Sequence, residues 1–126
     1  MNCRPVLLSA ALAAAAGLAQ AADAQKGAVV FKKCQACHTA TDAKNRVGPS
    51  LQNLLGRPVA TVEGFKYSKA MTEFAAGKTW DETLLATYLA APRQMVKGTT
   101  MAFAGLKKPE DVADIIAYLK DPAAAQ

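Results

Sequence analysis

Two thiols and an imidazole stand close together in the segment CQACH at residues 34–38. His38 is the only histidine of the 126-residue chain, and the third cysteine, Cys3, lies near the N-terminus. A Cys-x-x-Cys pair can be a redox-active dithiol, half of a zinc site, a structural disulfide or the attachment point of a haem. The segment alone does not distinguish these four kinds of site, so the rest of the sequence is needed to choose among them.

Covalent haem attachment explains this segment best. Two thiols at this spacing can meet the two vinyl groups of haem, and a histidine beside the second thiol can reach the iron. A structural zinc ion needs four ligands, but only Cys34, Cys37 and His38 are available beyond the N-terminal segment. A thioredoxin-like pair usually accompanies a strand–helix unit, which is not apparent, and a disulfide across so short a loop would stabilise little. We therefore predict one c-type haem attached through Cys34 and Cys37.

The second axial ligand of such a haem is restricted by composition. A single histidine excludes a bis-histidine haem and a second haem of the same kind. Beyond the N-terminal segment the methionines are Met71, Met95 and Met101. Met101 lies in a loop between two glycines, which let the backbone approach a flat ligand. This context favours Met101, while a lysine, another weak donor or an open position stay as alternatives at this point.

The first 21 residues are expected to be a secretory signal peptide. Arg4 precedes an apolar run over 6–19, and the small-residue sequence AQA follows it. The run is shorter than the roughly 20 residues that a membrane span needs, so we expect no stable membrane anchor. Cleavage after Ala21 is simplest, with Ala24 as an alternative. Removing 21 of the 126 residues leaves one domain of 105 residues, 22–126, and lowers the formal charge from +5 to +4.

The elements that position these residues are expected to be helices. The predicted helical segments are 23–35, 50–55, 68–75, 79–91 and 109–120. The last has an apolar stripe at helical spacing and begins with Pro109, which suits a first helical position. Thr79 and Glu82 have the spacing of a capping box, and Pro92 ends that helix. No segment alternates long enough for a sheet, so the predicted fold class is all-α.

The chain resembles the class I cytochromes c, the soluble bacterial relatives of mitochondrial cytochrome c. The resemblance extends from residue 27 to residue 119. Besides CQACH, the matching segments are VGPSL (47–51), LLGR (54–57), GFKYS (64–68), GKTW (77–80), TYLAAP (87–92), GTTMAFAGLKK (98–108) and DIIAYLK (114–120). It implies a small all-α class I cytochrome c fold wrapped around one covalently attached haem.

The resemblance also implies a role for each matching position that faces the haem. Cys34 and Cys37 would form thioethers, His38 would be the proximal ligand and Met101 the sixth ligand. The carbonyl of Pro49 would accept a hydrogen bond from the far ring nitrogen of His38 and fix the ring.

Four further side chains complete this implied site. Tyr88 would donate a hydrogen bond near the Met101 sulfur, which tunes a ligand that already favours ferrous iron. Arg57, Tyr67 and Trp80 resemble the groups that satisfy a buried haem propionate.

Other matches are structural or depart from the mitochondrial pattern. Gly27, Phe31, Tyr118 and Leu119 match the contact where the first and last helices cross. The departures are Thr100 where a lysine is usual, Lys97 where a proline is usual and Met71 where an asparagine is common.

The function implied is that of a soluble periplasmic one-electron carrier between respiratory or dehydrogenase donors and an acceptor such as an oxidase. The alternatives are a haem enzyme or gas sensor with a labile sixth ligand, or an electron acceptor dedicated to one dehydrogenase. The residues that would border the haem edge are Lys33, Arg93, Phe103, Lys107 and Lys108, whereas Lys44, Lys66, Lys69 and Lys78 are interpreted as solvated charges.

This basic border predicts acidic electron-transfer partners: membrane reductase and oxidase complexes, or a periplasmic dehydrogenase. Nucleic acid is not expected as a partner, because no basic run is present in an exported chain. The protein is expected to be a monomer.

Overall fold

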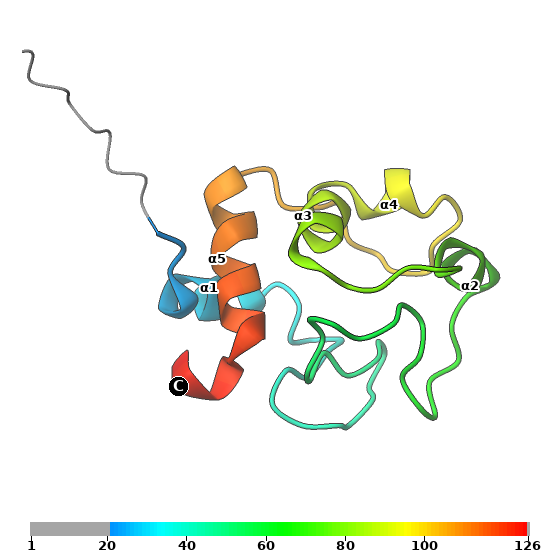
Figure 1. Ribbon diagram of the computed structural model, residues 1–126, viewed down its shortest axis with the longest axis horizontal. Coiled ribbons are helices and arrows are strands. Elements are labelled where there is room, and N and C mark those ends of the chain that lie inside the picture. Colours follow the sequence, from blue (N-terminus) through cyan, green and yellow to red (C-terminus); the bar gives the residue numbers. More distant parts are fainter. Residues whose placement is uncertain (1–20, 126) are drawn as a thin grey trace, which may run out of the picture.

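A computed structural model describes residues 21–125 and is built from helices and long connecting segments (Figure 1). The elements in chain order are α1 (Ala24–Phe31), α2 (Lys69–Phe74), α3 (Glu82–Ala90), α4 (Pro92–Met95), α5 (Pro109–Lys120) and a terminal 3-10 turn, η1 (Pro122–Ala125). Within the described residues the only extended pairing is an isolated bridge between Pro58 and Thr79. The predicted all-α fold class is therefore confirmed.

The predicted signal peptide lies outside the described residues, apart from Ala21. Among residues 21–125, no helix has both the length and the apolar character to cross a membrane.

Helices α1 and α5 cross at one end of the molecule, and Gly27 makes their close approach possible (Figure 1). A Cβ atom at Gly27 would lie only 2.0 Å from the carbonyl oxygen of Asp114 and 2.7 Å from Cβ of Tyr118. Beside this point the rings of Phe31 and Tyr118 pack with centroids 5.2 Å apart. The contact implied for Gly27, Phe31 and Tyr118 is thus present, and Leu119 belongs to the same core.

Asp23 ties the start of α1 to α5 through both its backbone and its side chain. Its carboxylate caps α1 by accepting hydrogen bonds from the N–H groups of Gln25 and Lys26. Its own N–H donates to Oδ1 of Asp114 over 2.7 Å. The buried Asp114 therefore has a partner that fixes where the chain enters α1.

The predicted helix over 23–35 ends at Phe31, four residues early. Beyond that residue the chain forms tight turns, in which Gln35 N–H donates to Phe31 O, and the N–H groups of Cys37 and His38 both donate to Cys34 O. These turns, rather than a continued helix, carry the thiol pair.

The predicted helix over 50–55 is wrong. Asn53 has φ of 53°, in the left-handed region, and this interrupts any helix there. The hydroxyl of Ser50 accepts from Gln52 N–H and donates to Asp42 O, so local hydrogen bonds replace those of a helix.

The predicted capping box at Thr79 is also wrong, although the helix it introduces exists. Asp81 caps α3, because its Oδ1 accepts from Leu84 N–H over 2.7 Å. The segment before it is extended: Val59 N–H donates to Lys78 O, and Trp80 N–H donates to Arg57 O. This pairing holds Thr79 away from a capping position.

The remaining helix predictions hold well. Helix α5 spans Pro109–Lys120 as predicted, with proline in its first turn, and α2 is capped by Ser68 as the 68–75 segment suggests. The core lies where α3 and α5 meet the loops, and its most buried side chains include Val96, Leu85 and Ile115.

The helix crossing gives a direct test of packing. Gly27→Ala should lower the free energy of unfolding of the haem-loaded protein by roughly 1–3 kcal/mol, since the added methyl group meets backbone atoms that cannot move aside. Chemical denaturation would measure it. Val29→Ala is the control, because Val29 lies on the same helix and is 62% exposed. Equal stability of the two variants would contradict the crossing.

Candidate haem site

All nine residues predicted for the site line one cavity of about 280 Å³. They come from the turns after α1, from the segment that leads to α2, from α3 and its approach, and from the loop before α5. The residues are Cys34, Cys37, His38, Pro49, Arg57, Tyr67, Trp80, Tyr88 and Met101. The fold therefore brings together positions spread over 68 residues of sequence, from 34 to 101.

The two thiols lie on consecutive turns at one wall of this cavity. Cys34 and Cys37 are both free and partly buried, and a hydrogen bond from Cys37 N–H to Cys34 O joins them over 3.0 Å. Burial raises the pKa of the Cys34 thiol, while the Lys33 ammonium opposes this rise and Cys37 adds to it. Both sulfur atoms are thus available for covalent attachment of a cofactor within the cavity.

His38 is held in one orientation by the backbone of Pro49. Its Nδ1 atom lies 2.7 Å from Pro49 O, and because a carbonyl oxygen can only accept, Nδ1 carries the proton. Burial lowers the pKa of His38, and the hydrogen bond to Pro49 acts in the opposite direction. The ring is therefore a neutral imidazole with Nε2 free to bind a metal ion.

Gly48 is a site residue that sequence reasoning missed. A Cβ atom there would lie 2.3 Å from Cε1 of His38, so the imidazole rests directly against the bare backbone. Gly48 N–H also donates to Cys37 O over 2.8 Å and ties this backbone to the thiol turn. The available signal was a glycine immediately before the proline that holds the histidine.

Met101 reaches the cavity from the loop between α4 and α5. Tyr88 O–H donates to Met101 Sδ over 3.9 Å, and burial raises the pKa of Tyr88 to about 12, so the hydroxyl stays protonated. Gly105, with φ of 107°, lies so close to α3 that a Cβ there would be 2.2 Å from Ala90 O. Leu106 N–H donates to Leu89 O and completes the anchor of this loop.

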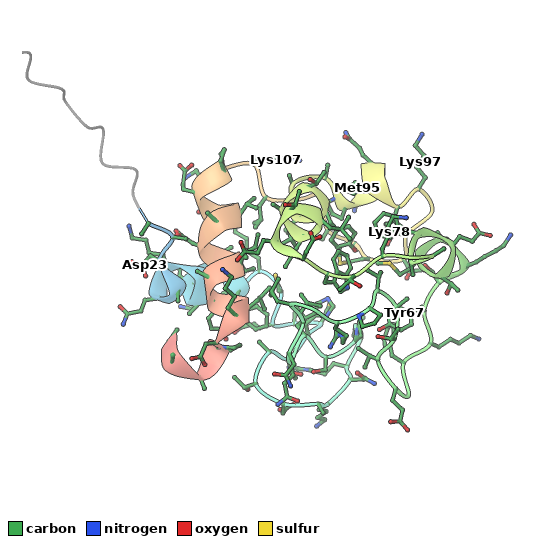
Figure 2. The ribbon with its side chains drawn as sticks, viewed as in Figure 1. Asp23, Tyr67, Lys78, Met95, Lys97 and Lys107 are labelled. Carbon is green, nitrogen blue, oxygen red and sulfur yellow. The ribbon has the colours of Figure 1, made fainter. Side chains whose placement is uncertain are left out.

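The other methionines occupy different places. Met71 also lines the cavity, whereas Met95 packs against the core without being among the lining residues (Figure 2). Of the departures from the mitochondrial pattern, Met71 and the exposed Thr100 line the cavity, whereas Lys97 is exposed and does not line it.

Arg57 provides an unmatched hydrogen-bond donor in the cavity wall. Its two terminal nitrogens donate to the carbonyls of Gln52 and Ser50, each over 3.0 Å, while the buried Nε has no partner. Burial lowers the pKa of Arg57, an effect that Tyr67 partly opposes. A buried unsatisfied donor costs free energy, so this arrangement suits an acidic group that arrives with a ligand.

Tyr67 and Trp80 complete the same side of the cavity. Tyr67 lies on the segment that precedes α2, and its hydroxyl oxygen accepts from Val62 N–H over 3.0 Å, which leaves its own proton for another acceptor (Figure 2). Trp80 is buried with its ring centroid 5.0 Å from that of Tyr88. The cavity thus combines two thiols, an imidazole, a thioether and an unpaired hydrogen-bond donor. This set of groups is suited to bind a haem and its propionates.

A second hollow lies between the outer faces of α3 and α5. It is wider, at about 700 Å³, but its lining is mainly alanine and threonine with a few charged residues and contains no thiol, imidazole or thioether. The side chains that could bind a haem therefore line the smaller cavity.

Comparison with known proteins agrees with this geometry. The family model described as Cytochrome c matches residues 24–122. Cytochrome c2 iso-2 of Magnetospirillum fulvum is 50% identical over 90 residues, which cover 71% of this chain and 92% of that protein. Cytochrome c2 of Blastochloris viridis is 46% identical, with 86% and 85% covered. The structure of cytochrome cH from Methylobacterium extorquens aligns with a TM-score of 0.71 at 40% identity, covering 78% of this chain and 97% of that one.

The contact between Gly48 and His38 leads to a prediction. Gly48→Ala should force the imidazole from its place, change the visible spectrum of the haem-loaded protein and lower its unfolding free energy by roughly 1–3 kcal/mol. Spectroscopy and chemical denaturation would measure both effects. Val29→Ala is the control, since the Val29 side chain is 62% exposed and does not line the cavity. A Gly48→Ala protein that resembles this control in both properties would refute the contact.

Proposed function

Because the chain belongs to the cytochrome c family, we propose that it is a one-electron carrier whose single haem c is bound by His38 and Met101. The observation that carries this proposal is that one cavity is lined by the thiol pair, by a pre-oriented imidazole and by a thioether that receives a hydrogen bond. Cys34 and Cys37 hold the haem covalently, which is the mode of attachment typical of this family.

The chain contributes ligands that suit electron transfer and oppose other chemistry. The bound haem supplies an iron that changes oxidation state by one electron. His38 would bind it through Nε2, while the hydrogen bond to Pro49 keeps the ring from turning. Met101 would be the second residue to bind the iron, which would leave no coordination position for a substrate. A soft thioether favours the ferrous state and gives a comparatively high reduction potential.

We assign Arg57, Tyr67 and Trp80 to a propionate of the haem. The unpartnered Nε of Arg57 and the available hydroxyl proton of Tyr67 are donors that a carboxylate would satisfy. A carboxylate buried without such donors would be costly. A charge-assisted hydrogen bond would in turn remove the cost of the unmatched Arg57 donor.

Exposed basic residues support docking to acidic partners. Lys33 lines the cavity and is exposed; Arg93, Lys107 and Lys108 are also exposed but are not among the residues that line the cavity. Lys107 Nζ donates to Ala104 O, which holds this charge beside the Met101 loop (Figure 2). Such a border attracts acidic proteins and speeds their encounter. The partners proposed are membrane reductase and oxidase complexes, or a periplasmic dehydrogenase, approached by a monomeric carrier.

We further propose that residues 1–21 direct export to the periplasm and that residues 22–126 form the mature domain. The two candidate cleavage positions differ in their consequence for α1. Cleavage after Ala24 would remove Asp23, which caps α1 and binds Asp114, whereas cleavage after Ala21 keeps both interactions. The cap therefore favours Ala21 as the processing position.

The sixth ligand can be tested by substitution. Met101→Ala in the haem-loaded protein should lower the reduction potential by on the order of 0.1 V or more, a fraction of the roughly 0.8 V that axial ligands span. The reduced variant should also bind carbon monoxide, because an axial position becomes open. Redox titration and absorption spectra measure these effects. Met95→Ala is the control, and an unchanged potential in Met101→Ala would overturn the assignment.

The docking surface can be tested through its charge. Lys33→Glu should slow electron transfer from the reduced protein to hexacyanoferrate(III) roughly ten-fold at low ionic strength, at the lower end of the range that steering provides. Near 1 M salt, where the screening length is about 3 Å, the difference should disappear. Lys66→Glu changes the net charge equally and serves as control. If both variants slow transfer equally, the cavity border has no special role.

A further inference from the structure

The ring of Tyr88 is held by two other aromatic rings. Its centroid lies 5.0 Å from that of Trp80 and 6.3 Å from that of Phe74, whose plane is inclined to it by only 29°. Phe74 and Trp80 are themselves 6.4 Å apart, so the three rings form one cluster. Trp80 and Tyr88 are buried, whereas Phe74 is partly exposed. Phe74 is therefore the ring of this cluster that solvent and surface side chains can contact.

Phe74 is also a main connection between α2 and the rest of the site. Helix α2 has six residues and lies at the end of the molecule opposite to α1 and α5; among the described elements its backbone approaches no other helix (Figure 1). Met71 and Phe74 both pack against the core from this helix. Their side chains, rather than a helix–helix interface, hold α2 in place.

Lys78 covers Phe74 from the solvent side. Its Nζ atom lies over the Phe74 ring, 4.9 Å from the centroid, within the range of a cation–π interaction. The turn after α2 sets this position: Gly77 has φ of 68°, and Lys78 N–H donates to Ala75 O. Lys78 is exposed, as expected for a solvated charge, and it contacts the Phe74 ring in addition.

We propose that Phe74, covered by Lys78, is a positioning residue that holds the Tyr88 hydroxyl against the Met101 sulfur and so helps to set the reduction potential. At 3.9 Å the O–H···S hydrogen bond is long, and a small tilt of the Tyr88 ring would break it. Phe74 and Trp80 restrict that tilt, and of the two only Phe74 does not itself line the cavity. This inference rests on Met101 as the sixth ligand.

The direction of the effect follows from electrostatics. The positive end of the Tyr88 O–H dipole points at the sulfur atom that would bind the iron, so it disfavours the ferric state more than the ferrous state. Loss of the hydrogen bond should therefore lower the reduction potential. Any substitution that loosens Tyr88 should act in the same direction, and only while the hydroxyl is present.

The test is a double-mutant cycle on the haem-loaded protein, read by redox titration and by the weak far-red band of methionine-bound ferric haem. Tyr88→Phe should lower the potential, Phe74→Leu should lower it less, and the double variant should match Tyr88→Phe alone. Phe74→Tyr keeps a ring and should retain the parent potential. An unchanged potential in Phe74→Leu, or a shift of equal size in the Tyr88→Phe background, would overturn the proposal.

Lys78→Gln repeats the test at an exposed position that leaves the core intact. It should lower the potential more than Lys66→Gln, which removes the same charge elsewhere, and this excess should vanish when Tyr88 is replaced by Phe. If Lys78→Gln still lowered the potential more than Lys66→Gln in the Tyr88→Phe background, the effect would come directly from the lost charge. That result would overturn the role assigned to Lys78. A parent protein without the far-red band would refute Met101 ligation itself, whereas an intact band with no Phe74 effect would refute only the positioning role.

Discussion

The close approach of α1 to α5 at Gly27 determines where the haem-binding turn can lie. A single methyl group would separate the two helices, because the Asp114 carbonyl occupies the space beside Gly27. One turn later Phe31 packs on Tyr118, and the helix ends there, three residues before Cys34. The packing of α1 against α5 thus sets the position of the thiols, although Gly27, Phe31 and Tyr118 are not themselves part of the candidate site. The other residues of the site line the cavity opposite or beside these thiols.

The polar groups of the cavity are arranged so that each proposed iron ligand contacts a neighbour from another part of the chain. His38 depends on the Pro49 carbonyl, and Met101 receives the Tyr88 hydroxyl. Arg57 has two of its nitrogens satisfied by backbone carbonyls and one left for an incoming group. Such a site is pre-organised on the protein side, which reduces the reorganisation that accompanies a change of charge at its centre.

Local patterns predicted the helices whose ends are marked by local residues. Helix α5 follows from Pro109 and one apolar stripe, and the predicted segment 68–75 contains α2, which the structure shows to be capped by Ser68. The absence of a helix over 50–55 could not be predicted, because the left-handed Asn53 depends on the surrounding loop. Asp81 replaces Thr79 as a cap for a similar reason: pairing with the segment at Pro58 and Val59 extends the chain there.

The same distinction applies to the site. The motif and the resemblance indicated which residues line the cavity, since their types and spacing carry that information. Gly48 and the cover over Phe74 were missed, because each matters only through a neighbour that folding brings near it.

The hydrogen bond between Asp23 and Asp114 spans 91 positions of the chain, and it has a consequence for the order of assembly. A chain that is synthesised from its N-terminus contains the Cys34–Cys37 segment well before α5 exists to pack against α1. The two sulfur atoms are therefore accessible before the wall of the cavity is complete. The contact between α1 and α5 can form only once the last helix is present, so packing of that helix fixes the wall that carries the thiols.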